Sequence, residues 1–201
     1  MEQGSVFLAQ FMTLSDGVEV NGETISVIVD GMANFRDTAI KILAENGIIN
    51  PQAGEWYDQQ AWLNSFKKIS SALHAVTLTY IGRKIPESAN FPVELDGIEA
   101  ALKSIDVAYH MNHRRNGEIL FDSVTGKMKE GIGHYLYKRI AVNRAVMVCH
   151  NPYPCDFDRG IIDAVAFRHK PVGTTNVRVT HEAPDHCRKN GYDFCTYMVE
   201  W

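Results

Sequence analysis

The stretch CHNPYPCDFDRG (residues 149–160) and the later stretch HEAPDHCRKNGYDFC (181–195) decide how the fold of this chain is interpreted. Together they hold all four cysteines of the 201 residues, namely Cys149, Cys155, Cys187 and Cys195. Thiolates set close to imidazoles and carboxylates are the donors that a zinc site uses. Prolines in the first stretch and the Asn190-Gly191 pair in the second indicate turns, which place the cysteines near loop ends. The two stretches therefore predict a metal site that joins two loops, with buried free thiols or a disulfide as the alternatives.

The sequence around these cysteines predicts two pairs of strands with a helix between them. HYLYKRI (134–140) and RAVMVCH (144–150) are typical of paired strands, and residues 156–169 return to helical spacing. NVRVTHE (176–182) and FCTYMVEW (194–201) then predict a second pair of strands. In this interpretation Asp156 and Asp158 lie at the solvated start of the helix. The resulting β-β-α-β-β unit predicts an antiparallel sheet.

The N-terminal part predicts mainly helices. Large apolar residues recur at three- and four-residue spacing over 57–82, and a further helix is predicted over roughly 93–113. An Asn21-Gly22 pair between two β-branched runs predicts a hairpin over 17–29. We therefore predict an α+β protein in which N-terminal helices pack on an antiparallel sheet. A single domain over 1–201 is expected, with a mainly helical part (1–115) and a sheet part (116–201).

Composition narrows the class of protein. Hydrophobic residues make up 45% and charged residues 22%, as is ordinary for a globular chain. The net charge of −4 gives no general attraction to nucleic acid or to an anionic membrane. Apolar runs are too short to span a bilayer. The start MEQGSVFLAQFMTL has no basic region, so a signal peptide is not expected and a cytoplasmic location follows.

The cysteine stretches resemble the 4-vinyl reductase domain, which also occurs as the ligand-sensing domain of aromatic-responsive bacterial regulators. Its wider fold group includes haem-nitric-oxide-binding domains and a set of Golgi transport proteins. The resemblance is carried, in chain order, by Cys155, Gly160, the helix IIDAVAFRHK, the strand NVRVTHE, Glu182, Cys187, Gly191 and Cys195. Phenol-type sensors with this domain bind a structural zinc through one Glu and three Cys.

This resemblance implies a set of zinc ligands. Carried over residue by residue, it implies Cys155, Cys187, Cys195 and Glu182. Glu182 lies farther from the first of the paired cysteines than the acidic residue of the family does. The alternatives for the fourth ligand are Asp185, His186 and Cys149.

Three histidines and one tyrosine form a second candidate site. His110 and His113 share one face near the end of the third predicted helix, and His134 begins a strand. Such histidines either complement the helix dipole, hold haem iron or another metal, or contact a ligand. In the aromatic sensors, side chains upstream of the zinc loop bind the ligand, and His134 and Tyr137 occupy the comparable stretch.

The function that we predict from the sequence is a zinc-stapled domain that binds or senses a small hydrophobic or aromatic molecule. Tetrapyrrole or haem binding, or an accessory role in tetrapyrrole reduction, is one alternative, and a protein-interaction module is another. No phosphate-binding, dinucleotide-binding, nucleophile-elbow or zinc-protease motif occurs, so an enzyme is less expected and no catalytic residue is assigned. The resemblance implies a homodimer, and a separate signalling protein is the expected partner.

Overall fold

The computed structural model describes residues 10–32, 35–92 and 95–201. Its helices are α1 (Gly22–Asp30), α2 (Arg36–Glu45), α3 (Gln59–Ala72), α4 (Ala75–Ser88), α5 (Gly97–Met111) and α6 (Cys155–Arg168). Its first strands are β1 (Val18–Asn21), β2 (Trp56–Asp58), β3 (His113–Arg115), β4 (Glu118–Ile119), β5 (Phe121–Asp122) and β6 (Lys127–Met128). The remaining strands are β7 (His134–Ala141), β8 (Arg144–His150), β9 (Arg178–Glu182) and β10 (Cys195–Glu200).

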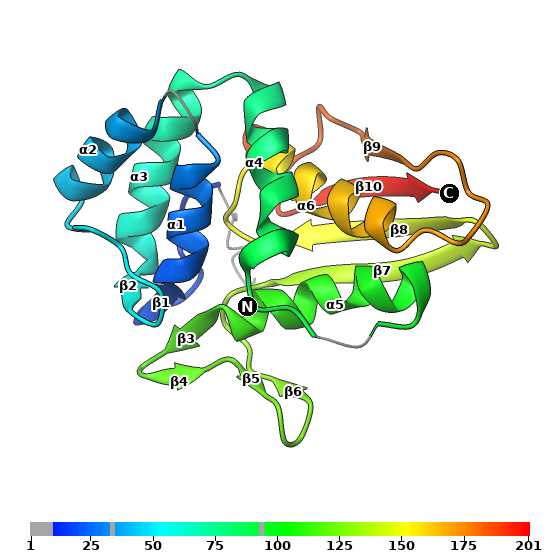
Figure 1. The fold of residues 1–201 in the computed structure, drawn as a ribbon, viewed down its shortest axis with the longest axis horizontal. Helices are drawn as coiled ribbons and strands as arrows, with labels where there is room; N and C mark the ends of the chain where they lie inside the picture. The colour runs from blue at the N-terminus through cyan, green and yellow to red at the C-terminus, as the bar shows by residue number, and fades with distance from the viewer. Residues whose placement is uncertain (1–9, 33–34, 93–94) are drawn as a thin grey trace, which may run out of the picture.

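The main sheet is antiparallel and has the strand order β7-β8-β10-β9. Helices α5 and α6 cover one face of it, and α1 to α4 form a separate helical layer beside them (Figure 1). A small sheet of order β2-β1-β3-β4 joins this layer to the end of α5. The α+β class and the β-β-α-β-β order predicted from the sequence are therefore confirmed.

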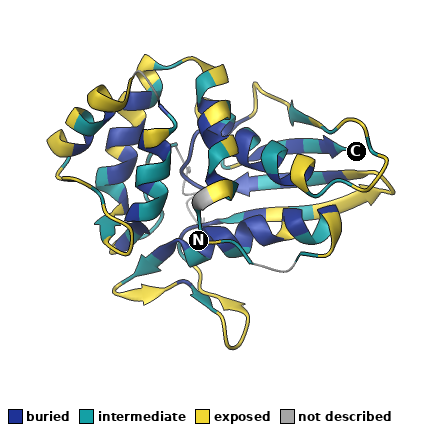
Figure 2. Cartoon of the chain, viewed as in Figure 1, coloured by how far each residue is buried: buried dark blue, intermediate teal, exposed yellow. Residues whose placement is uncertain are grey.

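Side chains alternate across the main sheet, and this alternation decides which residues meet α6. In β10 the residues Cys195, Tyr197 and Val199 are buried, whereas their neighbours are partly exposed (Figure 2). Cys149 of β8 is paired with Cys195, and His181 of β9 is paired with Tyr197. Paired residues lie on the same face of a sheet. The covered face therefore carries both cysteines and His181.

Helices α4 and α6 cross with backbone against backbone. A Cβ added at Gly82 would collide with the main-chain oxygen of Phe157, and one added at Gly160 would collide with that of Thr79. Only glycine allows helix backbones to approach this closely. The crossing fixes the helical layer against the helix that begins at Cys155.

Two predictions of local structure are wrong. The Asn21-Gly22 pair does not form a hairpin turn, because the Asn21 side chain accepts a hydrogen bond from the Glu23 N–H (2.9 Å) and caps α1. Gly22 is instead needed because the Gln52 carbonyl lies where its Cβ would be. An Asn-Gly pair occurs both at helix caps and in hairpin turns. Here the apolar residues that follow recur at helical spacing, so the pair begins a helix.

The helix predicted over 57–82 is two helices. The chain becomes extended at Leu73, and α4 starts anew after His74. The apolar spacing does not continue across this break, because Val76 is 77% exposed although the pattern placed it inside. The helix predicted over 93–113 is present as α5, with residues 93–94 outside the described part of the chain.

Candidate functional site

Three cysteines meet where α6 begins. Cys155 is the first residue of α6, Cys195 opens β10, and Cys187 lies in the loop before it. All three are buried and free of disulfides. The Sγ atom of Cys155 lies 3.1 Å from that of Cys195 and 3.9 Å from that of Cys187. Tetrahedral zinc with Zn–S bonds of about 2.3 Å places sulfurs about 3.8 Å apart. The Cys155–Cys187 distance matches this spacing, whereas the Cys155–Cys195 distance is shorter.

His181 completes the cysteine cluster. One donor atom from each of Cys155, His181, Cys187 and Cys195 lies within 4.8 Å of the other three. The His181 ring stacks on Tyr197 with ring centroids 4.8 Å apart, and its buried Nε2 has no hydrogen-bond partner among the described residues. Three thiolates and one imidazole form a closed donor set that zinc favours. His181 was not among the ligands assigned from the sequence, where the resemblance implied Glu182 instead.

Glu182, the fourth ligand implied by the resemblance, does not join the cluster. It is paired with Thr196 and lies on the sheet face opposite to Cys195 and His181. Successive strand residues point to opposite faces, so His181 and Glu182 cannot both reach the cysteines. The choice between the two follows from the register of β9 on β10, which the sequence alone does not give.

The three alternatives for the fourth ligand also lie outside the cluster. Asp185 and His186 are exposed in the loop before Cys187, where the His186 ring packs on Tyr192. Cys149 is buried and faces the same side as Cys195, but it is not one of the four clustered donors. Burial raises the pKa of the Cys149 thiol, so this group stays protonated at neutral pH. That these clustered residues bind a metal remains a prediction.

The cluster contains one thiol that ionises easily. The hydrogen bond from Cys155 holds the pKa of Cys195 well below its usual range, and the nearby His181 and Arg188 act in the same direction. The same hydrogen bond and burial raise the pKa of Cys155. Cys195 therefore carries the thiolate, which is the form that binds metals.

A buried ion pair lies directly behind the cysteines. The side chains of Arg188 and Asp158 are both fully buried and form a salt bridge. Arg188 also contacts Asn151 and the Cys195 sulfur, and Tyr135 donates a hydrogen bond to Asp158 (2.6 Å). Burial raises the pKa of Asp158 to about 6, while the guanidinium beside it opposes this rise. Asp158 was interpreted from the sequence as a solvated helix-start residue, and that interpretation is wrong.

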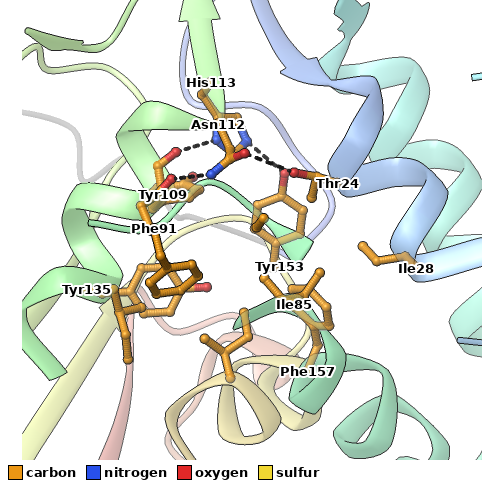
Figure 3. Close-up of a pocket in the computed structure, with 14 residues that line it drawn as sticks. Thr24, Ile28, Ile85, Phe91, Tyr109, Asn112, His113, Tyr135, Tyr153 and Phe157 are labelled. Carbon is orange, nitrogen blue, oxygen red and sulfur yellow. Dashed lines mark hydrogen bonds between the residues drawn. The ribbon is translucent and has the colours of Figure 1, made fainter. Parts of the chain in front are cut away.

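A partly open cavity of about 50 Å³ lies between the helical layer and the α5 side of the molecule. Figure 3 shows its side chains converging from α1, α4, α5 and the start of α6. Most are apolar, and they include Ile28, Ile85, Phe91, Phe157 and Ile161. Polar groups line one end, namely Thr24, Asn112, His113 and Tyr153.

Both ring nitrogens of His113 are hydrogen-bonded. Its Nδ1 lies 2.7 Å from the main-chain oxygen of Tyr109, which can only accept, so Nδ1 carries the proton. Its Nε2 is then the acceptor for the Tyr153 hydroxyl at 2.9 Å. Burial lowers the pKa of His113 to about 4. The ring is therefore neutral at pH 7, and the lone pair of its Nε2 accepts the hydrogen bond from Tyr153.

The four side chains predicted to contact a ligand separate into different places. His113 lines the cavity, whereas His110 and His134 lie together beside Asp106. Tyr137 lies on β7 with the Lys103 ammonium 5.2 Å from its ring centroid, and it does not line this cavity. Tyr135, two residues earlier on the same face of the strand, does so. Spacing along the chain did not distinguish these positions.

The pKa of His113 gives a testable dependence of stability on pH. The unfolded imidazole has a pKa of about 6.5 and the folded one about 4, so the unfolded state alone binds this proton between those values. We expect the free energy of unfolding to fall by about 3 kcal/mol from this group as pH falls from about 6.5 to about 4. Urea unfolding of ligand-free wild type and of His113→Gln at several pH values measures it. Identical pH profiles for the two proteins would contradict it.

Comparisons with solved structures identify the fold of this chain. No protein-family model matches the sequence, and no curated protein matches it. An H-NOX protein from S. oneidensis, solved in its Fe(II)NO state, aligns with a TM-score of 0.57 at 12% identity over 90% of this chain and 98% of that chain. The H-NOX from Shewanella woodyi, solved in its Fe(II)CO state, gives 0.51 at 16% identity over 89% and 93%.

A further H-NOX structure, from work on haem distortion in that family, gives a TM-score of 0.58 at 14% identity, covering 90% of this chain and 94% of that chain. At these sequence identities the comparisons show a shared fold, and they do not show a shared function or a shared ligand. The wider fold group named from the sequence is confirmed, whereas membership of the 4-vinyl reductase family is not shown. The chain thus has the fold of the haem-nitric-oxide-binding domains.

Proposed function

We propose that this chain is a sensor domain that binds a small molecule in the cavity between its helical layer and α5. The observation that carries the proposal is a buried, mostly apolar cavity closed at one end by the His113–Tyr153 hydrogen bond. Ligand sites commonly combine apolar walls with a few fixed polar groups. His113 and Tyr153 already satisfy each other, so this pair offers a ligand the remaining lone pair of the Tyr153 hydroxyl oxygen as an acceptor.

The size of the cavity limits the ligand. A single buried water needs about 10–15 Å³, so 50 Å³ accommodates a molecule of only a few heavy atoms. An aromatic ligand, one of the small molecules predicted from the sequence, would require lining side chains such as Phe91 or Phe157 to move. Among the described residues no helix combines the length and apolar character that a bilayer span requires.

Haem is the second candidate ligand, and the structural comparisons favour it over the zinc-centred function. The donor chemistry of His113 suits it, because a metal-binding histidine usually donates its other N–H to a carbonyl, as His113 does. The space does not suit it. Drug-sized ligands occupy about 300–1,000 Å³, so a cavity of 50 Å³ does not hold haem in this conformation.

A structural metal at the cysteine cluster supports the proposed domain. Cys155, His181, Cys187 and Cys195 present four donors with the spacing that zinc uses. Such a metal would hold the start of α6 against β9 and β10. This proposal keeps three of the ligands implied by the resemblance and exchanges Glu182 for His181.

Two titrations test the proposed function. Haem is added to purified protein and followed by absorbance, and xenon is added separately and followed by shifts of the isoleucine methyl NMR signals. Either a stoichiometric haem band that His113→Ala abolishes, or xenon shifts centred on Ile28 and Ile85, supports a binding cavity. His74→Ala, which alters an exposed histidine, serves as the control for haem. Failure of both probes overturns the proposal.

Filling the cavity gives a second check. Ala108 lines the cavity from α5, and Ala108→Leu adds three carbons to it. We expect at least a tenfold loss of affinity for whichever probe binds, while overpacking costs about 1–3 kcal/mol of stability. Ala100→Leu on the same helix lies outside the cavity lining and is expected to bind as wild type. Equal affinities for all three proteins would place the ligand elsewhere.

A further inference from the structure

A second group of donors lies where the last turns of α5 meet the start of β7. One donor atom from each of Asp106, His110 and His134 lies within 4.8 Å of the others. His134 Nδ1 is 2.9 Å from one carboxylate oxygen of Asp106, and His110 Nδ1 is 3.6 Å from the other. Donors bound to one transition metal at about 2.0–2.2 Å are separated by about 3 Å or slightly more. The His134–Asp106 pair lies at this separation, and the His110 ring lies beside it.

His110 supplies an observation that a simple ion pair does not explain. Its Nδ1 lies 2.8 Å from the main-chain oxygen of Asp106, so Nδ1 carries the proton and Nε2 holds a lone pair. The side chain is fully buried, yet Nε2 has no hydrogen-bond partner within the described chain. An unpaired buried acceptor lowers stability. A metal-binding histidine has this arrangement, with one nitrogen fixed by a carbonyl and the other available.

The surroundings of His134 supply negative charge and access from solvent. Its Nε2 lies 3.1 Å from Glu130, whose side chain is 83% exposed. The rings of His110 and His134 face each other with centroids 4.9 Å apart. Asp106 is held in place by a hydrogen bond from the Tyr135 N–H (2.9 Å). Although partial burial opposes it, hydrogen bonds to Asp106 and Glu130 raise the pKa of His134, so a metal ion that binds here displaces a proton from this ring. The site opens to solvent at Glu130.

We propose that Asp106, His110 and His134 bind a divalent first-row transition-metal ion, with Glu130 as a further oxygen donor. Two imidazoles and a carboxylate suit Zn²⁺, Fe²⁺ and Co²⁺ rather than the soft ions that thiolates prefer. This site shares no ligand with the cysteine cluster. It also does not depend on a ligand in the cavity, so it stands or falls separately from the proposed function.

Cobalt titration of the full-length protein, loaded first with one equivalent of zinc per chain for the cysteine cluster and freed of excess zinc, tests the site. Equilibrium dialysis with metal analysis counts the bound Co²⁺, and absorbance shows the type of donor. We expect one Co²⁺ per chain with weak visible bands and without the strong near-ultraviolet band that thiolate ligands give. Uptake that appears only with the thiolate band belongs to the cysteine cluster and overturns the proposal. An absence of saturable uptake also overturns it.

Substitutions assign the ligands. His134→Gln is expected to weaken Co²⁺ binding at least tenfold, and Glu130→Gln, at an exposed position that folding does not require, to weaken it several-fold. His169→Gln, at the end of α6 and outside the site, is the control and is expected to bind as wild type. Circular dichroism of the metal-free variants checks the fold. Unchanged affinity in both His134→Gln and Glu130→Gln would leave Asp106 and His134 as an ordinary hydrogen-bonded pair.

Discussion

Replacing Cys187 with serine is expected to release the metal from the cysteine cluster and to lower the thermal stability of the chain. Serine keeps the size of the side chain but removes the thiolate, which leaves three of the four donors. At a free zinc concentration about 1,000-fold above the dissociation constant, bound zinc stabilises a folded chain by about 4 kcal/mol. For a chain of this length that is about 8–16 °C in Tm. Metal analysis and calorimetry of wild type and variant measure both effects.

Cys149→Ser is the matched control for this experiment. Cys149 is also buried and also faces α6, but it does not belong to the four clustered donors. We expect this variant to keep one zinc per chain, with only the loss of stability that a buried hydroxyl causes. His181→Ala is expected to weaken zinc binding, whereas Glu182→Ala is expected to leave it unchanged. Equal zinc contents in wild type and Cys187→Ser would rule out the cluster as the metal site.

Replacing Asp158 with asparagine is expected to destabilise the fold by about 3–5 kcal/mol, because it leaves the buried Arg188 charge without its partner. Both side chains are fully buried, and Arg188 has no route to solvent in this position. Urea unfolding of the wild type and the variant measures the change. Asp30→Asn is the control, since Asp30 pairs with Arg36 at the surface and is expected to cost less than about 1 kcal/mol.

A double-mutant cycle shows whether the cost comes from the pair. Replacing both partners, as in Asp158→Leu with Arg188→Met, removes both buried charges and is expected to cost less than Asp158→Asn alone. A double variant whose loss equals the sum of the single losses would show that the two charges act independently. The Tyr135 hydroxyl loses its acceptor in the variant with Asp158→Leu, whereas an asparagine oxygen can still accept, so Tyr135→Phe is the reference for that contribution.

The sequence alone predicted the secondary structure correctly where the spacing of apolar residues and the turn residues indicate the same element. The strands β7 and β8, the helix α6 and the strands β9 and β10 appear in the predicted order. Local signals failed where one pattern has two structural uses. Asn21 caps α1, although the same Asn-Gly pair also favours turns. Val76 interrupts the apolar face that would have joined α3 to α4.

For the candidate sites too, the sequence predicted some features correctly and missed those that depend on contacts between distant residues. The turns in the two cysteine stretches predicted a metal site that joins two loops, and the family resemblance implied Cys155, Cys187 and Cys195 among its ligands. The choice between His181 and Glu182 depended on strand register, which is set by pairing with β10 and not by neighbours in the chain. Likewise the burial of Asp158 depends on Arg188, thirty residues later. The grouping of Asp106 with His110 and His134 depends on how β7 approaches α5.

The glycine crossing of α4 and α6 determines how this molecule can move. With backbone against backbone at Gly82 and Gly160, the two helices cannot slide along each other without first separating. Any motion that enlarges the cavity therefore has to be a rotation about this crossing, with the largest displacements far from it, at α1 and at the connector that carries Phe91. Amide hydrogens near the crossing are expected to exchange with solvent only upon global unfolding, whereas those at the ends of α1 exchange through local openings. For the proposed function, the crossing would serve as the pivot about which the helical layer turns to open the cavity.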